Sequence, residues 1–342
     1  MILVTGGTGL VGSHLLYRLT RDNASVKAIY RNSHKLEAVK KMFSYYSEDV
    51  ETLYNRIEWV EADVNDIPAL SEAFKNVTYV YHCAAFVSFE PDKYHQLRKI
   101  NIEGTANVVN LCISNTIQKL CYVSSIAAIG NETNPEKFIT EKTGWNPEAD
   151  HSVYAITKYG AEIEVWRGTQ EGVDAVIINP GVIVGPSFWK SGGSGSFFQK
   201  IYKGFPYYTD GMTGYVDVGD VIEIMVQLME SDIKNEAFIV ISENLSFKEF
   251  LSKVAKSMGM KPPHKKAGKL LLKLGWRLDW LQHKLQGKRR RLSKQMAQTA
   301  QTKTMYDASK IKNALNFTYR PMDASITSVG QYFLEDVKNQ RV

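Results

Sequence analysis

The chain has 342 residues, but it has no long apolar run and only three cysteines. No stretch reaches the roughly 18 apolar residues that a membrane-spanning helix needs, so we expect none. Cys83, Cys112 and Cys121 are odd in number and lack metal-ligand spacing. They indicate free buried thiols in a reducing compartment, and neither a disulfide framework nor a metal centre. We expect a cytoplasmic protein without a signal peptide, because an apolar run already begins at Ile2.

Acidic residues are nearly absent from one segment. Residues 265–294 contain eleven Lys or Arg and one acid, Asp279, so they carry +10 and leave about −4 for the remainder of a +6 chain. Leucines recur there at helical spacing: Leu270, Leu271, Leu274, Leu278, Leu281 and Leu285. Two interpretations stay open, a lid helix with a solvated basic face and an interfacial helix in weak peripheral contact with anionic lipid. No nucleic-acid-binding fold accompanies the charge, so we expect no nucleic acid partner.

What the chain does contain is a regular alternation of short apolar runs and helical patterns. The predicted strands are residues 2–5, 25–30, 56–61, 79–82, 120–123, 175–178 and 237–241. The predicted helices include residues 11–21, 103–114, 154–170 and 215–230. Continuous apolar strands that alternate with helices predict an α/β fold with a doubly wound parallel sheet.

A glycine pattern follows the first predicted strand, where residues 5–12 read TGGTGLVG. Gly6 permits a tight turn, Gly9 lets the backbone approach phosphates, and Gly12 lets helix and strand pack closely. The N-terminus of the following helix then presents free N–H groups to a pyrophosphate. The predicted dinucleotide loop is Gly6, Thr8, Gly9, Leu10, Val11 and Gly12.

A carboxylate is missing where the second predicted strand ends, at residues 30–33, YRNS. A carboxylate there would bond the ribose 2′-OH of NAD, whereas Arg31 with neighbouring donors suits the 2′-phosphate of NADP. A solvated arginine beside an NAD site is the alternative. We favour NADP(H) over NAD(H) on the charge argument.

Three side chains would carry hydride-transfer chemistry. Ser125 follows a later apolar run, and Tyr154 and Lys158 share a helix face one turn apart. A free tyrosine has a pKa near ~10, too high for ready proton exchange at neutral pH. We expect the Lys158 ammonium, with the positive nicotinamide ring, to lower that pKa. Ser125 would hydrogen-bond the substrate oxygen, to which Tyr154 gives a proton in reduction.

Asn101 leaves two roles open. Asparagine is a good helix N-cap, and a predicted helix begins two residues later. The same side chain could hold a water next to Lys158 in a proton relay. The sequence alone is compatible with both roles.

Together these motifs resemble the extended short-chain dehydrogenase/reductase superfamily over about residues 1–240. The resemblance implies a Rossmann fold and a homodimer formed through the helices at 103–114 and 154–170. It also implies a catalytic tetrad of Asn101, Ser125, Tyr154 and Lys158. The further cofactor contacts that it implies are Asp63 and Val64 at the adenine, Cys83, Ala84 and Ala85 at the ribose and phosphates, and Pro180, Ile183 and Lys158 at the nicotinamide.

Within the superfamily, the chain resembles dihydroflavonol-reductase-like and 3-beta-hydroxysteroid-dehydrogenase-like members at residues 122–128, 180–186 and 215–221. Sugar-nucleotide dehydratases of the superfamily carry an Asp-Glu pair where this chain has Ile126 and Ala127. Its epimerases bind a substrate pyrophosphate with arginines, but no arginine lies between Arg167 and Arg277 here. Both departures disfavour those activities.

The composition changes after residue 186, and residues 187–215 are rich in glycine and aromatic side chains. We expect a dinucleotide-binding domain of residues 1–186 and 212–242, and a smaller, mostly helical substrate domain of residues 187–211 and 243–342. The aromatic side chains either bind a flat, apolar carbonyl compound or form the core of the smaller domain. They include Phe188, Trp189, Phe197, Phe198, Tyr202, Phe205, Tyr207, Tyr208 and Tyr215.

The sequence therefore predicts an NADP-dependent oxidoreductase that reduces a ketone or aldehyde of a mid-sized, largely apolar small molecule, or oxidises the matching alcohol. One alternative is a nucleotide-sugar epimerase with tightly held NAD. Another is a sensor or scaffold that binds the dinucleotide without turnover, against which the intact Ser125, Tyr154 and Lys158 set argues.

Overall fold

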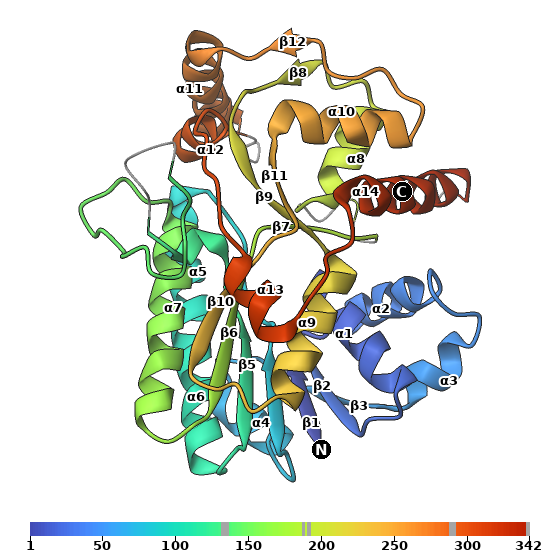
Figure 1. The fold of residues 1–342 in the computed structure, drawn as a ribbon, viewed down its shortest axis with the longest axis vertical. Coiled ribbons are helices and arrows are strands. Elements are labelled where there is room, and N and C mark those ends of the chain that lie inside the picture. The colour runs from blue at the N-terminus through green and yellow to red at the C-terminus, as the bar shows by residue number, and fades with distance from the viewer. Residues whose placement is uncertain (131–136, 187–188, 190–192, 287–291, 340–342) are drawn as a thin grey trace.

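A seven-stranded parallel sheet forms the centre of the protein (Figure 1). The computed structural model describes residues 1–130, 137–186, 189, 193–286 and 292–339. The sheet order is β10-β6-β5-β4-β1-β2-β3, which is the order of a doubly wound dinucleotide-binding fold with one added edge strand. The predicted fold class is confirmed. Its strands are β1 (Ile2–Thr5), β2 (Val26–Tyr30), β3 (Ile57–Glu61), β4 (Tyr79–His82), β5 (Lys119–Val123), β6 (Ala175–Pro180) and β10 (Glu236–Val240).

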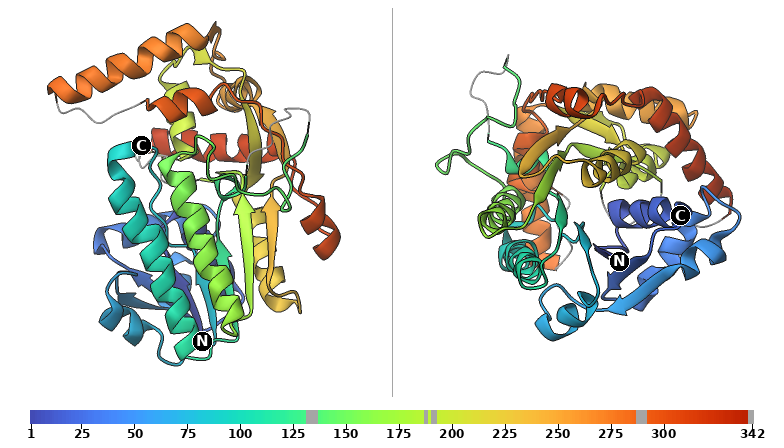
Figure 2. Two further views of the ribbon diagram at one scale, coloured as in Figure 1. Left: turned by 90° about the vertical axis from the view of Figure 1, so that its left-hand side faces the viewer. Right: turned by 60° about the horizontal axis from the view of Figure 1, so that its bottom comes forward.

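Helices cover both faces of this sheet, which explains why its strands are apolar along their length (Figures 1 and 2). Every residue of β6 is buried. One face packs against α1 (Leu10–Arg21), α2 (Leu36–Phe43), α3 (Val50–Asn55), α9 (Val218–Glu230) and α13 (Ser309–Leu315). The other face packs against α4 (Ile67–Ala73), α6 (Gly104–Ser114) and α7 (Val153–Gln170). A short helix, α5 (Tyr94–Leu97), and a π-helical turn, Arg98–Glu103, lead into α6.

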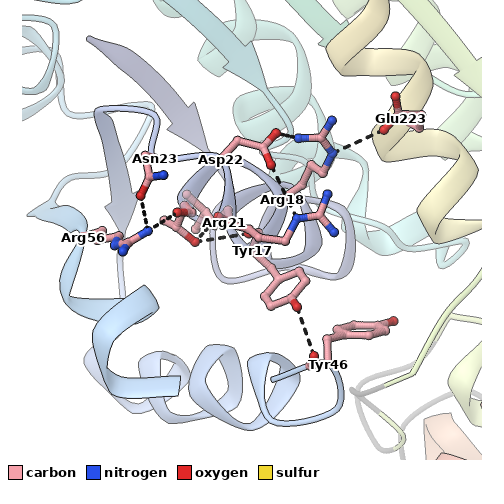
Figure 3. Close-up of polar contacts among 10 residues, drawn as sticks. Tyr17, Arg18, Arg21, Asp22, Asn23, Tyr46, Arg56 and Glu223 are labelled. Carbon is pink, nitrogen blue, oxygen red and sulfur yellow. Dashed lines mark hydrogen bonds and ion pairs between the residues drawn. The ribbon is translucent and has the colours of Figure 1, made fainter. Parts of the chain in front are cut away.

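Polar side chains tie the C-terminal end of α1 to its neighbours (Figure 3). Arg18 lies between Asp22 of its own helix and Glu223 of α9, with Arg18 Nε 3.3 Å from Glu223 Oε2. Arg56, just after α3, donates to the Thr20 carbonyl at 2.9 Å and to the Asn23 side chain. These contacts hold the helix that begins at the glycine loop in one position on the sheet.

A second sheet of three strands, in the order β11-β9-β7, was not predicted. It consists of β7 (Val182–Val184), β9 (Met212–Asp217) and β11 (Glu243–Ser246). The predicted helix at 215–230 begins too early, because its first three residues belong to β9. Asp217 ends the strand and caps α9, since its side chain accepts a hydrogen bond from the Gly219 amide at 2.7 Å.

The C-terminal region is mostly helical, as predicted, and has its own apolar core. It packs α8 (Gly195–Tyr202), α10 (Phe247–Ser257) and α14 (Met322–Lys338) against the second sheet, and a two-strand pair, β8 (Tyr207–Tyr208) and β12 (Lys265–Lys266), lies beside them. Trp189, Phe198 and Tyr215 are buried in this core, so for these three the structural interpretation holds. Phe205 remains exposed. Phe188 lies outside the described residues.

Two segments of the C-terminal region lie outside this core. The helix α13 returns to the large sheet, where Ile311 is buried against β10 and α9. The helices α11 (Lys269–Gln286) and α12 (Lys294–Thr299) lie at one edge of the molecule, and α11 extends past the ribbon beneath it (Figure 2). The basic residues at 288–291 lie outside the described residues. Among the helices that the structure describes, none is long and apolar enough to cross a membrane.

Candidate active site

The glycine loop and the turn after β4 form one continuous backbone surface. Gly6 has φ +68°, a conformation that glycine adopts without strain, and a Cβ there would lie 2.6 Å from the Ala84 nitrogen. The Ala84 amide donates to Thr5 Oγ1 at 3.3 Å, and the Cys83 amide donates to the Thr5 carbonyl at 3.2 Å. The structure therefore brings the predicted loop together with Cys83, Ala84 and Ala85.

The N-terminus of α1 is open for an anion. Gly9 is the exposed N-cap residue, no side chain caps the helix, and no acidic residue lies in its first turn. A Cβ on Gly9 would meet only the Gly6 carbonyl, at 3.4 Å, whereas one on Gly12 would lie 2.2 Å from that same oxygen. Free amides at a helix N-terminus next to bare backbone fit a dinucleotide pyrophosphate, with Thr8, Leu10 and Val11 beside it.

Arg31 lies directly after β2 and is half-exposed, with Nη1 3.2 Å from Asp63 Oδ2. Partial burial raises the pKa of Asp63, but hydrogen bonds from Asn65 and Arg31 outweigh burial and lower it overall. His34 and Lys35 follow, and residues 30–36 contain no carboxylate. The end of β2 thus presents cations, with one acid, Asp63, across from them.

Val64 is buried at the neighbouring strand end, where its carbonyl accepts from Asn107 Nδ2 at 3.0 Å. A Cβ on Gly104 would lie 2.6 Å from Val64 Cγ2, so glycine is required for α6 to approach this strand end. On the other side of the site, the Ile183 carbonyl in β7 accepts from Ser194 Oγ. Pro180 is the buried last residue of β6.

Ser125 lies near enough to Tyr154 to affect the pKa of its phenol. Ser125 is positioned by its own turn, because its Oγ accepts from the Ala127 amide at 3.1 Å. Burial raises the pKa of Tyr154 to about 12, and Ser125 lowers it only in part. The phenol is therefore protonated at neutral pH.

Lys158 is buried one turn along α7 from Tyr154. Its ammonium donates to Tyr122 Oη at 2.6 Å and to the Val123 carbonyl at 2.9 Å. The expected lowering of the Tyr154 pKa by Lys158 is therefore absent from this arrangement, since the ammonium points to Tyr122. Burial lowers the pKa of Lys158 itself to about 7, against the raising effects of Glu162 and Cys83.

Glu162 is a site residue that we did not predict. Its Oε2 accepts from Ser124 Oγ at 2.6 Å and from Asn179 Nδ2 at 2.9 Å, which links α7 to the ends of β5 and β6. Burial raises the pKa of Glu162, and its hydrogen bonds and Lys158 oppose that rise. The position, four residues after Lys158 on the same helix face, was a signal visible in the sequence.

Asn101 does not cap a helix, so the N-cap interpretation is wrong. It lies inside the π-helical turn Arg98–Glu103, a feature that often occurs at functional sites. Its Oδ1 accepts from the Phe86 amide at 2.7 Å, and its Nδ2 donates to the Phe86 carbonyl and to Thr157 Oγ1 at 3.1 Å. Both amide hydrogens are thus used, which leaves the second lone pair of Oδ1 for the predicted water.

An apolar side chain that we did not predict, Phe89, lies beside Tyr154. The ring of Phe89 meets the Tyr154 ring edge-on at 5.4 Å, and both Phe89 and Val87 are exposed. Their loop follows β4 and carries no sequence motif. The site thus combines a proton donor, a buried cation and an apolar surface at one edge of the sheet.

A model of the family described as NAD dependent epimerase/dehydratase matches residues 2–241, which include every strand of the large sheet. The chain belongs to this family. The match ends just after β10, so family membership covers the dinucleotide loop and the Ser125, Tyr154 and Lys158 cluster. It leaves α10 to α14 without a family assignment.

Curated relatives and solved structures agree with this membership. A putative dihydroflavonol 4-reductase of Synechocystis sp. is 26% identical over 266 residues, 76% of this chain and 73% of the relative. The sterol demethylase protein B of Methylococcus capsulatus is 25% identical over 73% of this chain and 72% of its own. A UDP-glucose 4-epimerase of Thermotoga maritima, solved with UDP-glucose, shares the fold at a TM-score of 0.76 and 19% identity over 98% of this chain and 99% of its own. The protein is an NAD(P)-dependent oxidoreductase that acts on alcohol or carbonyl groups.

Proposed function

We propose that this protein is an NADP-dependent reductase of a ketone or aldehyde on a mid-sized, largely apolar substrate, with Tyr154 as general acid. In the reverse direction it oxidises the matching alcohol. The grouping of Tyr154 with the apolar ring of Phe89, buried Lys158 one helix turn away and Ser125 nearby carries this proposal. The bound dinucleotide supplies the hydride.

Ser125, Tyr154 and Lys158 each have a separate role in the reaction. Ser125 Oγ, held by the turn at Ala127, donates to the substrate oxygen and orients it next to Tyr154. The Tyr154 phenol, protonated because burial raises its pKa, transfers its proton to that oxygen. The Lys158 ammonium, which in this structure donates to Tyr122 and the Val123 carbonyl, would turn toward the phenolate left after transfer and stabilise its charge. A protonated phenol at neutral pH suits the reductive direction.

The surroundings favour an apolar substrate. Phe89 is exposed beside Tyr154, and Val87 of the same loop is exposed as well. No arginine lies between Arg167 and Arg277 to pair with a pyrophosphate. One relative is named for a dihydroflavonol and another for a sterol, and both names denote ring compounds with much apolar surface.

Arg31 gives the test of the cofactor. Titration with NADPH and NADH should show a preference for NADPH, and Arg31→Ala should weaken NADPH binding by roughly 10–100-fold while NADH binding stays unchanged, since a charge-assisted hydrogen bond contributes about 1.5–3 kcal/mol. Arg21→Ala is the control, because Arg21 is equally exposed at the far end of α1. Equal affinity of the wild-type protein for NADPH and NADH would contradict the NADP assignment. An Arg31→Ala protein that loses affinity for both cofactors equally would contradict it as well.

An epimerase with tightly held NAD is the second candidate, favoured by the shared fold of a solved UDP-glucose 4-epimerase. The two candidates differ in how the cofactor behaves. A reductase releases it after each turnover, whereas NAD that survives purification, with turnover of a nucleotide sugar and none of a carbonyl panel, would favour the epimerase.

Lys158 gives the test of the pH dependence. Its pKa is lowered to about 7, so the ammonium is lost as pH rises through that value, and kcat/KM for reduction should fall above about pH 7. In Glu162→Gln the negative charge that favours the ammonium is gone, so the midpoint should move to lower pH. Glu164→Gln is the control, because Glu164 pairs with Arg167 at 2.9 Å away from the site. A midpoint that does not move, or moves upward, would show that Lys158 does not control the profile.

We also propose a homodimer formed through α6 and α7. Ile156 and Ile163, both on α7, are exposed large apolar side chains on the face turned away from the sheet. A four-helix contact between two copies would bury them. The molar mass in solution, measured by light scattering, should be about twice 38.7 kDa, and a value of 38.7 kDa would contradict the dimer.

A further inference from the structure

The helix α11 shows its leucines to solvent. Six leucines are exposed by 43% to 78%: Leu270, Leu271, Leu274, Leu278, Leu281 and Leu285. At 3.6 residues per turn they lie within about 100° around the helix axis, and we call this surface the leucine arc. Leu272 and Trp276 lie on the opposite side, where they pack against Ala267, Ala297 and Leu292. The lid interpretation explains Leu272 and Trp276, but it leaves the leucine arc without a partner.

Cations flank this leucine arc. Lys273, Arg277 and Lys284 are exposed and occupy the adjoining side of the helix. Arg277 lies over the Trp276 ring at 4.6 Å, and Lys284 lies over the Trp280 ring at 5.3 Å. Among the described residues, the ion pairs of this region involve Lys266 and Lys294, and none involves these three cations. The groove lined by Leu274, Leu278, Leu281 and Trp280 is thus apolar and rimmed by unneutralised positive charge.

We propose that α11 docks on an anionic lipid surface, with the leucine arc in the acyl boundary and Lys273, Arg277 and Lys284 at the phosphate headgroups. An apolar arc flanked by Lys and Arg is the arrangement of an interfacial helix. Anionic headgroups supply partners for Lys273, Arg277 and Lys284, which form no ion pair with a carboxylate among the described residues. The position of α11, which extends past the rest of the ribbon, lets it reach a flat surface (Figure 2).

A second copy of the chain fits the arc less well. The helix is 18 residues long, so its exposed stripe is about 27 Å by 10 Å, or roughly 270 Å². A stable interface takes about 800 Å² from each partner. Two facing copies would also bring their cationic flanks together, with Asp279 as the only acid of α11 and already bound to the Leu292 amide at 3.2 Å.

The docked helix would be linked through α12 to the segment that leads into the active-site helix α7. From α12, which packs against α11, Gln298 Nε2 donates to Asp150 Oδ2 at 3.3 Å, and Lys294 lies 4.0 Å from the same carboxylate. Asp150 is four residues before Tyr154. The lipid contact itself does not depend on the proposed reductase function.

Co-sedimentation of the full chain with vesicles tests the proposal. Wild-type protein should pellet with vesicles of phosphatidylcholine and phosphatidylglycerol at low salt, and far less with pure phosphatidylcholine. The charge variant K273Q/R277Q/K284Q should bind the anionic vesicles about 100-fold more weakly, at about 1 kcal/mol for each cation. The leucine variant L274S/L278S should weaken binding to them by at least roughly tenfold. The control K75Q/K99Q/K338Q removes three exposed lysines elsewhere and should bind like wild type.

Three results would overturn the proposal: no pelleting of wild type with anionic vesicles, equal pelleting with neutral ones, or equal losses in the control. A molar mass that falls by half only in the leucine variant would assign the arc to a second copy instead. NADPH affinity and the unfolding temperature, measured for each variant, show that it is folded. Because the readout is lipid binding, these outcomes are separate from those for the reductase activity.

Discussion

Changing Tyr154 to phenylalanine is expected to lower kcat for carbonyl reduction by roughly 10²–10⁴-fold, the contribution of a positioned general acid. The substitution removes only the phenolic hydroxyl and keeps the ring that meets Phe89 at 5.4 Å. NADPH affinity and the unfolding temperature should therefore stay close to those of the wild type. Steady-state rates at saturating NADPH, on the first carbonyl compound that the wild-type protein reduces, give the measurement.

Tyr159→Phe is the matched control for this loss. Tyr159 lies on the same helix, but its ring stacks on Trp145 at 4.3 Å. Its kcat should remain that of the wild type. A Tyr154→Phe protein that keeps its kcat would refute the general-acid assignment, and equal losses in both variants would point to a disturbed α7.

Gly12→Ala is expected to raise the Kd for NADPH by at least about 100-fold, which corresponds to about 2.7 kcal/mol. The new Cβ would lie 2.2 Å from the Gly6 oxygen and 2.9 Å from the Gly7 Cα, so the loop backbone must move. Movement of the loop turns its amides away from the pyrophosphate position. We expect a lower unfolding temperature as well, because overpacking costs about 1–3 kcal/mol.

Gly9→Ala separates binding from folding. Its Cβ would meet only Gly6, at an ordinary 3.4 Å, and would point into the space for the phosphates. This variant should lose NADPH affinity and keep the wild-type unfolding temperature. Gly144→Ala, which meets nothing within 4 Å, should change neither quantity. Full NADPH affinity in both loop variants would place the cofactor elsewhere.

Much of the large sheet was predictable because its strands are buried on both faces. A continuous apolar run such as β6 marks a strand whose neighbours need not be known. Glycines and hydroxyls at strand ends then meet at one edge of the sheet whatever the detailed packing. The close approach of Gly6 to Ala84 follows from that rule alone.

The second sheet could not be predicted, because its strands are short and pair over long distances. Val182 pairs with Tyr215, and Tyr215 pairs with Glu243, so no local periodicity marks the three residues of β7. The direction of the Lys158 ammonium could not be predicted for the same reason, because Tyr122 becomes its partner only when α7 packs on β5. The sequence pattern on one helix predicts which residue belongs to the site, but the packing of the neighbouring strand determines that residue's hydrogen-bond partner.

The return of α13 to the large sheet has a consequence for how the protein forms during synthesis. Ile311 and Ala308 complete a core that α1 and β10 begin, and they follow β10 by about 70 residues along the chain. At roughly 5–20 residues per second, the ribosome leaves that apolar surface open for several seconds after β10 emerges. The large sheet therefore cannot cover this part of its core until α13 has been made, and truncation before residue 308 removes those core residues.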